Sequence, residues 1–271
     1  MNYKKTYVPG NGYTPICKIG ECSLKQLEFG IIELTDGQDL TFDTEDRETA
    51  FILLNGRASF SARGVDYGTL GVRTNVFSSP KAEAFYAPRR CVVSIHSPWH
   101  VKIAVCATPV DEDTEPQAIH QADVRLLKLG VKPWERDTSF IVDGSTNAKK
   151  LTIGEAYVTP GNWAGFPPHK HDTDNMPAEC VAEEVYYFLF DPPQGFGVQC
   201  LYTSDGEIDE AYRVKNDELV EFPRGYHTTV SAPGYNTYFL WLMAGDHQGF
   251  CRTNDPDHAW VGAVENLIKK S

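Results

Sequence analysis

The stretch Pro-Pro-His-Lys-His-Asp, residues 167–172, contains two histidines in a His-x-His pattern. Residues i and i+2 of a β-strand point to the same face. His169 and His171 can therefore bring both imidazoles to one point, while Lys170 points away. A His-x-His pair alone is more often part of a surface or a packed core than a metal site, so the residues that follow decide its meaning.

Two further signatures follow in order along the chain. The stretch EEVYYF, residues 183–188, opens a strand with Glu183 and Glu184, of which only one can face the imidazoles because neighbouring strand residues point opposite ways. The stretch EFPRGYH, residues 221–227, uses a Pro-x-Gly turn to place a third histidine, His227, at the start of a strand. This combination favours a metal site over packing.

Three neutral imidazoles and one carboxylate form a ligand set that suits a divalent transition metal. We expect one ion per chain, zinc first, with manganese or iron as alternatives. The expected ligands are His169, His171, Glu184 and His227.

Short strands punctuated by glycine and proline run through both halves of the chain, and this pattern predicts an all-β barrel or jelly roll. Residues 49–60, TAFILLNGRASF, indicate two strands paired around an Asn55-Gly56 hairpin turn. One short helix is expected at residues 264–270. The other expected strands are residues 83–86, 91–96, 101–107, 150–158, 184–190, 197–203, 210–214, 218–222, 227–232 and 237–243.

An acidic stretch with two prolines, residues 108–121, is the best candidate for a linker. It predicts an N-terminal barrel at residues 1–115 and a C-terminal, metal-binding barrel at residues 116–271. The N-terminal barrel contains His96 and His100 without the His-x-His spacing, so we expect no metal there. Its expected task is structural, through paired sheet edges or a dimer surface.

Composition restricts the partners. The 271 residues carry a formal net charge of −12, which disfavours capture of nucleic acid or of an anionic membrane. No apolar run is long enough for a signal peptide or a membrane span, and the seven cysteines form no CxxC pair. We therefore expect reduced cysteines and a cytoplasmic location. Exposed sheet edges predict a homo-oligomer.

The order of these motifs resembles that of the cupin superfamily, whose members are antiparallel jelly-roll barrels, and two such barrels in tandem make a bicupin. The chain is more closely similar to the 5-deoxy-glucuronate isomerase family of bacterial inositol catabolism, which is related to the 4-deoxy-uronate isomerases. The resemblance covers roughly residues 145–262 and is looser over the first 110. The segments that carry it are GNWAGFPPHKHD (161–172), EEVYYFLFDPPQGFGVQ (183–199), DEAYRV (209–214), VEFPRGYHTTVSAPGYNTYFLWLMAG (220–245), NDPDHAWV (254–261) and, less specifically, ETAFILLNGRA (48–58).

Two departures from the general cupin pattern affect the ligand assignment. The gap between His171 and the glutamate is long, so residues 172–182 are expected to form a loop, and the second motif is PxGxH in place of PxGxxH. Cupin glutamates stand directly before a Val-aromatic pair, and this resemblance selects Glu184 over Glu183 as the ligand.

The resemblance implies an aldose–ketose isomerase that converts 5-deoxy-D-glucuronate to 5-dehydro-2-deoxy-D-gluconate, with a uronate-type sugar acid as its partner. Such a step needs a Lewis acid and a base for the carbon-bound proton. The candidates for the base are a hydroxide on the metal, Glu183, Tyr187 and Tyr238. Arg224 and Lys170 are candidates to bind the substrate carboxylate.

Two other functions stay open on the sequence alone. The same ligand set serves cupin dioxygenases, in which iron(II) activates oxygen. A non-catalytic sugar-binding bicupin is the other alternative, although storage bicupins often lack the metal ligands that are intact here. No helix-turn-helix pattern is apparent, which disfavours a transcription regulator.

Overall fold

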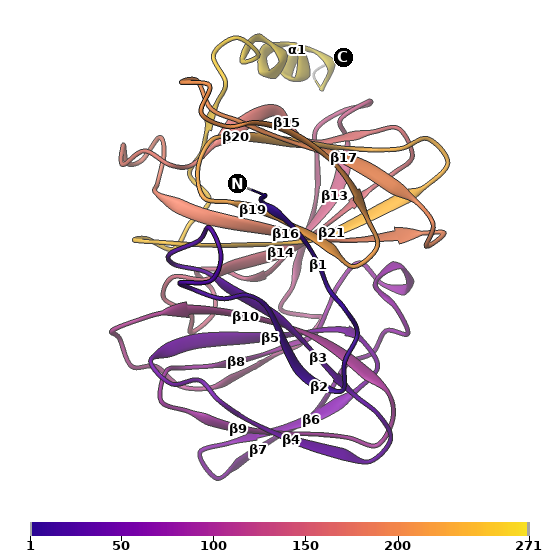
Figure 1. Ribbon diagram of the computed structural model, residues 1–271, viewed down its shortest axis with the longest axis vertical. Coiled ribbons are helices and arrows are strands. Elements are labelled where there is room, and N and C mark those ends of the chain that lie inside the picture. Colours follow the sequence, from indigo (N-terminus) through magenta and orange to yellow (C-terminus); the bar gives the residue numbers. More distant parts are fainter. Residues whose placement is uncertain (1, 270–271) are drawn as a thin grey trace.

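Antiparallel strands make up nearly the whole chain, and they form four sheets stacked on one another, two from each half of the sequence (Figure 1). In order of stacking we call these sheets outer N-terminal, inner N-terminal, inner C-terminal and outer C-terminal. Three apolar cores fill the spaces between neighbouring sheets. The computed structural model describes residues 2–269.

The N-terminal half supplies two sheets. The inner N-terminal sheet has six strands, in the order β11 (Gln117–Ile119), β8 (Ala84–Ala87), β5 (Arg47–Asn55), β10 (Val101–Pro109), β3 (Glu28–Leu34) and β2 (Gly12–Cys17). The outer N-terminal sheet has four, in the order β4 (Gln38–Asp43), β9 (Val92–Ser97), β6 (Ala58–Ala62) and β7 (Val65–Leu70). A 3-10 helix, η1 (Val76–Ser78), follows β7.

The C-terminal half supplies the other two sheets and the one α-helix among the described residues, α1 (Trp260–Ile268). The inner C-terminal sheet has seven strands, in the order β1 (Lys4–Thr6), β19 (Glu218–Phe222), β16 (Ala182–Asp191), β21 (Asn236–Gly245), β14 (Thr152–Val158), β13 (Arg136–Val142) and β12 (Arg125–Leu129). The outer C-terminal sheet has five, in the order β18 (Asp209–Lys215), β17 (Phe196–Tyr202), β20 (Tyr226–Ser231), β15 (Trp163–Lys170) and β22 (Thr253–Asn254).

The predicted all-β fold of the cupin, jelly-roll class is confirmed. Its backbone ladders leave four open sheets packed face to face rather than two closed barrels. The expected helix at residues 264–270 corresponds to α1, which begins earlier, and residue 270 lies outside the described residues. No helix of residues 2–269 combines the length and apolar character that crossing a membrane requires.

The predicted hairpin at Asn55-Gly56 is wrong, although both of its strands exist. β5 pairs with β10 and β8, whereas β6 pairs with β9 and β7. The turn therefore carries the chain from the inner to the outer N-terminal sheet. β5 is buried along nearly its whole length and packs on two cores, with Ile52 in one and Phe51 in the other. Such a strand belongs in the middle of a sheet, covered on both faces.

Two short strands connect the chain's beginning and middle to distant parts of the fold. β1 lies at the edge of the inner C-terminal sheet and pairs with β19. β11 falls within the expected linker, residues 108–121, and pairs with β8 of the N-terminal half. The division at residues 115/116 stays a prediction, as do the homo-oligomer and the cytoplasmic location.

Strand alternation on β16 positions the candidate site. Val185 and Tyr187 point into the core between the two inner sheets. Tyr186 and Phe188 point the other way, into the core of the C-terminal half. Glu184 has the same parity as Tyr186, so its carboxylate faces the C-terminal core.

Candidate metal centre

The three motif histidines reach one place because two strands of the outer C-terminal sheet lie side by side. His169, near the end of β15, is directly opposite His227, the second residue of β20. His171 follows β15 by one residue. The chain then runs through residues 172–181, without a further strand, before β16 brings Glu184 across from the inner sheet.

The loop that follows the His-x-His motif, residues 172–181, is hydrogen-bonded to the Pro-x-Gly turn at residues 223–225. The Asp172 carboxylate accepts a hydrogen bond of 2.8 Å from the backbone N–H of Gly225. Gly225 has a φ of 98°, and a Cβ there would lie 2.7 Å from the carbonyl oxygen of Tyr202. Only glycine fits this turn without strain, and the turn delivers His227 to the centre.

His171, Glu184 and His227 form a compact, buried group whose ligand atoms all lie within 4.8 Å of one another. Oε2 of Glu184 is 2.9 Å from Nε2 of His171 and 2.9 Å from Nε2 of His227. All three side chains are nearly inaccessible to solvent. The structure therefore brings together three of the four expected ligands.

Hydrogen bonds on the far side of each ring indicate which nitrogen faces the centre. Nδ1 of His171 lies 2.7 Å from the carbonyl of Ala182, and Nδ1 of His227 lies 3.3 Å from the carbonyl of Gly225. A carbonyl accepts a hydrogen bond, so each Nδ1 carries the proton and each Nε2 presents a lone pair. These lone pairs converge on a carboxylate oxygen.

Such a convergence of electron-pair donors fits a cation. Nε2 of His227 is buried and has no hydrogen-bond partner, because its 2.9 Å approach to Glu184 lacks hydrogen-bond geometry. A buried polar atom left without a partner is costly. A divalent ion among the three groups would satisfy all of them, so the residues present fit the expected metal.

Electrostatics within the group agree with this reading. Burial raises the pKa of Glu184, but the His171 and His227 side chains outweigh it and lower the net pKa to about 2. Burial lowers the pKa of His227 below its usual value. Burial also opposes the charged form of His171, yet its hydrogen bond to Glu184 and the charge of that carboxylate raise its net pKa. Without an ion this favours a proton on Nε2 of His171 as well, and a metal ion would replace that proton to gain the lone pair.

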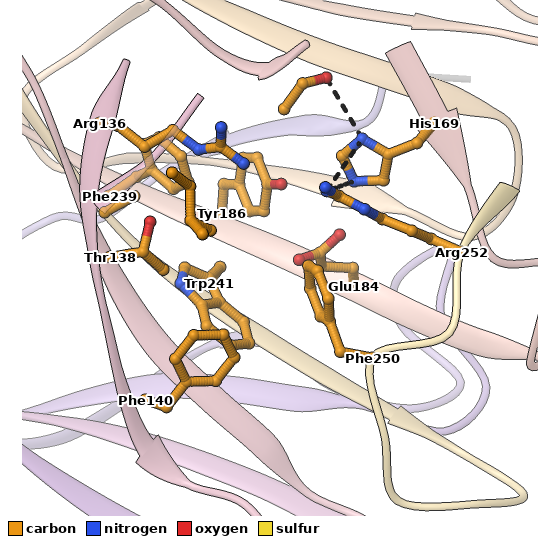
Figure 2. A pocket seen from close by; sticks show the side chains of 13 residues that line it. Arg136, Thr138, Phe140, His169, Glu184, Tyr186, Phe239, Trp241, Phe250 and Arg252 are labelled. Atoms are coloured by element: carbon orange, nitrogen blue, oxygen red, sulfur yellow. Dashed lines mark hydrogen bonds between the residues drawn. The ribbon is translucent and has the colours of Figure 1, made fainter. Parts of the chain in front are cut away.

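His169 stands slightly apart from the other three. Its ring centroid is 4.5 Å from that of His227 and 6.4 Å from that of His171. Nδ1 lies 3.2 Å from the carbonyl of Gly165, and Nε2 lies 3.2 Å from Nη1 of Arg252 (Figure 2). Burial, and then the charge of Arg252, lower the pKa of His169 well below its usual value, so the imidazole is neutral.

A narrow pocket opens beside His169 and Glu184, and side chains leave a cavity of only about 20 Å³ in it. Most of its wall is apolar and aromatic, with a few polar groups, as in typical small-molecule sites. Figure 2 shows the tyrosine hydroxyl and the two guanidiniums among these side chains. The lining residues are Leu129, Arg136, Thr138, Phe140, Ala156, Gly165, His169, Glu184, Tyr186, Phe239, Trp241, Phe250 and Arg252.

Arg136, which is buried, and Arg252, which is half-buried, place two guanidiniums on the wall of this pocket. Burial, and then the charge of Arg252, lower the pKa of Arg136 to about 10. Burial lowers the pKa of Arg252 as well. Within residues 2–269 neither guanidinium forms an ion pair with a carboxylate, and Arg252 hydrogen-bonds only the neutral His169. The pocket therefore has two positive charges that no carboxylate contacts directly, and the nearest negative charges that act on them are those of Glu184 and Glu265.

The side chains expected to supply a base lie elsewhere. Tyr187 donates a hydrogen bond to Asp217, and Tyr238 donates one of 2.8 Å to Glu155; both tyrosines belong to the core between the inner sheets. The Glu183 carboxylate accepts hydrogen bonds of 2.9 Å and 2.7 Å from the backbone N–H groups of Lys25 and Gln26. Strand alternation turns all three away from the pocket, so we do not retain them as base candidates.

The residues expected to bind the substrate carboxylate also lie outside the pocket. Lys170 pairs with Asp172 and lies 2.7 Å from Glu179, and so fixes the loop after the first motif. Arg224 is partly exposed and pairs with Asp205 and Glu207. Both cations already have carboxylate partners.

Sequence reasoning missed Arg136, Tyr186 and Arg252. Arg252 stands two residues before the NDPDHAWV segment, which gives it a weak signal by proximity. Arg136 follows a cis-proline turn with no recognisable motif. In the sequence Tyr186 looks like one more aromatic residue of a strand. Its position two residues after Glu184 places it on the same face of β16, and this is the signal that could have found it.

The chain matches the KduI/IolB family model over residues 4–261. A protein of Geobacillus kaustophilus (strain HTA426) named 5-deoxy-glucuronate isomerase is 37% identical over 233 residues, which cover 86% of this chain and 84% of the relative. A protein of Bacillus subtilis (strain 168) with the same name is 31% identical over 239 residues, 88% of each chain.

Solved structures show the same fold. The crystal structure of an IolB-like protein from Salmonella typhimurium LT2 superposes with a TM-score of 0.92 at 29% identity, and covers 97% of this chain and 100% of its own. An oxalate decarboxylase from Lactobacillus farciminis gives a TM-score of 0.68 at 10% identity and covers 99% of this chain and 92% of its own. At that identity the second likeness concerns the fold alone.

Proposed function

The chain belongs to the KduI/IolB family and is an isomerase, and from this premise we propose that it converts 5-deoxy-D-glucuronate to 5-dehydro-2-deoxy-D-gluconate in myo-inositol catabolism. The names of the relatives support the substrate. The reaction moves one proton between C1 and C2 of an open-chain sugar acid through an enediol. The pocket beside His169 and Glu184 is the proposed active site.

We propose that the centre holds one divalent metal ion, zinc first, with manganese or iron as alternatives. When bound, such an ion supplies a Lewis acid that polarises a carbonyl and stabilises negative charge on its oxygen. The proposed ligands are His169, His171, Glu184 and His227.

The two guanidiniums of the pocket support the assignment of substrate class. Arg136 and Arg252 line the same pocket as Glu184 and have no carboxylate partner among the described residues. A guanidinium pairs with a carboxylate through two parallel hydrogen bonds, and buried charges need a partner. An open-chain uronate has its carboxylate and its aldehyde at opposite ends. Binding of the acid end by Arg136 therefore directs the C1–C2 end toward the His/Glu group, which Arg252 contacts through His169.

Tyr186 and the aromatic wall complete the site. The Tyr186 hydroxyl has no hydrogen-bond partner within residues 2–269 and lies in the pocket lining, where it can donate to a substrate oxygen. The rings of Phe140, Trp241 and Phe250 pack against one another beside it. Such a wall excludes water, which strengthens the charge–charge contacts inside the pocket.

The test uses the full chain, stripped of metal by a chelator and then reloaded separately with zinc, manganese or iron(II). Ketose formation from 5-deoxy-D-glucuronate is followed without oxygen, with 5-deoxy-D-glucose as the uncharged analogue. We expect turnover that depends on added metal, and a much higher KM for the analogue.

Three outcomes would contradict the proposal. Full activity of the metal-free chain would show that the reaction does not need a metal ion. Turnover that requires oxygen would indicate a dioxygenase. Tight binding of the sugar acid without turnover, by the fully metallated chain, would indicate a binding protein.

A further inference from the structure

A second side-chain cluster lies outside the proposed active site, where the N-terminal half meets β19. Cys17 ends β2, Cys22 follows in the next loop, and Glu221 lies on β19. One ligand atom from each residue lies within 4.8 Å of the others, and the two Sγ atoms are 2.7 Å apart. All seven cysteines of the chain are free thiols in this structure.

The cluster is buried on one side and open on the other. Cys17 and Glu221 are each 1% exposed, whereas Cys22 is only partly buried. Oε1 of Glu221 has no hydrogen-bond partner, although Nζ of Lys5 lies 3.3 Å away. A dissolved reagent can therefore reach Cys22 first, with Cys17 directly behind it.

We propose that Cys17 and Cys22 form a reversible disulfide. The two sulfur atoms, 2.7 Å apart, are closer than two thiols that only pack together. A bond between them requires that this distance shorten to the roughly 2.05 Å of a disulfide. The four residues between them form a turn with a hydrogen bond of 3.1 Å from the Cys22 N–H to the Lys18 carbonyl, so the backbone is already folded back.

The oxidant is a small disulfide such as oxidised glutathione, and the chemistry is thiol–disulfide exchange. Sγ of Cys22, as thiolate, attacks one sulfur of the reagent and releases one glutathione. Sγ of Cys17 then attacks Sγ of Cys22 and releases the second glutathione, which leaves with the Cys17 proton. In sum, two protein S–H bonds and one reagent S–S bond become one protein S–S bond and two reagent S–H bonds.

This site lies at the base of the loop that fastens the two halves together. Downstream of Cys22, the Ser23 N–H donates a hydrogen bond of 2.9 Å to Glu221, and the Lys25 and Gln26 N–H groups hold Glu183. Glu183 neighbours the proposed ligand Glu184. A bond between Cys17 and Cys22 would therefore restrain the loop that clamps β16 beside the active site. This inference is independent of the proposed substrate.

The experiment incubates the full chain with oxidised glutathione or with dithiothreitol, then unfolds it in N-ethylmaleimide and digests it with trypsin. Cleavage after Lys18 separates the two cysteines unless they are bonded. We expect a linked peptide pair only in the oxidised sample, a fall from seven alkylated thiols to five, and a higher Tm than for the reduced chain.

Cys22→Ser is the test variant, and Cys200→Ser, which removes a half-buried thiol on β17, is the matched control. Cys22→Ser should abolish the linked pair and the rise in Tm, and Cys200→Ser should keep both. Full alkylation of Cys17 and Cys22 after oxidation of the wild-type chain would overturn the proposal. Protection of both thiols by one zinc ion that Cys22→Ser fails to bind would overturn it in favour of a second metal site.

Discussion

Nη1 of Arg252 lies 3.2 Å from Nε2 of His169, so an expected metal ligand presents its free nitrogen to a guanidinium. The contact is between a donor that is always charged and an imidazole whose pKa is held low, and it fixes both side chains at the mouth of the pocket. An anion bound here would be drawn to Arg252, which has no carboxylate partner among the described residues.

Arg252→Met should lower kcat/KM for the sugar acid by roughly 30- to 150-fold, the effect of losing about 2–3 kcal/mol from a charged hydrogen bond. Its metal content should not fall, because the substitution removes a positive charge near the centre. Arg224→Met is the matched control, since Arg224 pairs with Asp205 and Glu207 outside the pocket. A larger loss of kcat/KM for Arg224→Met would instead support Arg224 as the residue that binds the substrate carboxylate, as the sequence analysis expects.

The variants Glu184→Gln and Glu183→Gln test which of the two glutamates binds the metal. Glu184 lies 2.9 Å from two imidazole nitrogens, whereas Glu183 accepts backbone hydrogen bonds from Lys25 and Gln26 on the other side of β16. We expect Glu184→Gln to lose metal by elemental analysis after dialysis and most of its activity. Glu183→Gln should keep its metal and show a lower Tm. The reverse pattern would make Glu183 the ligand.

Tyr186→Phe and Tyr187→Phe separate the two faces of the same strand. The Tyr186 hydroxyl lines the pocket, and that of Tyr187 donates to Asp217 in the core between the sheets. Tyr186→Phe should lower kcat about tenfold, because one hydrogen bond of about 1.4 kcal/mol to the reacting sugar is lost. Tyr187→Phe should change Tm and leave kcat unaltered; equal kcat losses would argue against the assigned pocket.

Arg73 and Glu155 form a buried ion pair between the two halves, with an N–O distance of 2.5 Å and exposed fractions of 1% and 0%. Arg73→Met leaves the carboxylate unpaired, so we expect the free energy of unfolding to fall by roughly 3–5 kcal/mol in urea titrations. Arg73→Met with Glu155→Leu should lose less than Arg73→Met alone. A double variant that loses the sum of both single losses would show that the two charges do not interact.

Glu265 predicts a pH-dependent docking of α1. Its carboxylate accepts hydrogen bonds from Trp134 Nε1 at 2.9 Å and from Lys269 Nζ at 2.6 Å. Burial raises the pKa of Glu265, but these partners outweigh it and lower the net pKa below the usual 4.5. A lowered pKa means that the contact stabilises above pH 4.5 and is lost as the pH falls through the folded value.

The indole N–H resonance of Trp134, assigned by Trp134→Phe, reports this contact in NMR spectra. In the wild-type chain it should shift as the pH falls below 4.5, while Glu265→Gln should lack that transition. The same shift in both chains would assign the titration to another group.

Much of the fold could be predicted from the sequence, because short alternating strands and turn residues are local signals. The strand at residues 218–222 is β19 itself, and the one at 237–243 lies within β21. The partner of β5 was not predictable, because Asn55-Gly56 specifies a tight turn and not which sheet receives the next strand. Pairing across sheets depends on the burial of both faces of β5.

The candidate site was predictable only where chemistry and spacing coincide. His171, Glu184 and His227 each lie in a motif of the sequence, and the structure brings their ligand atoms together. Arg136 and Arg252 carry no motif, because they come from strand ends and loops that meet only in the folded chain. Tyr187 and Tyr238, two of the candidates for the base, lie in the core between the inner sheets, whereas Tyr186, which has the parity of Glu184, lies in the core of the C-terminal half.

The pairing of β1 with β19 sets an order on how a newly made chain can be completed. Residues Lys4–Thr6 leave the ribosome more than two hundred residues before their partners, Glu218–Phe222. This segment must therefore wait, unpaired, until β19 has been made. A truncation that removes residues 4–6, or a C-terminal half expressed by itself, would display β19 as an uncovered edge.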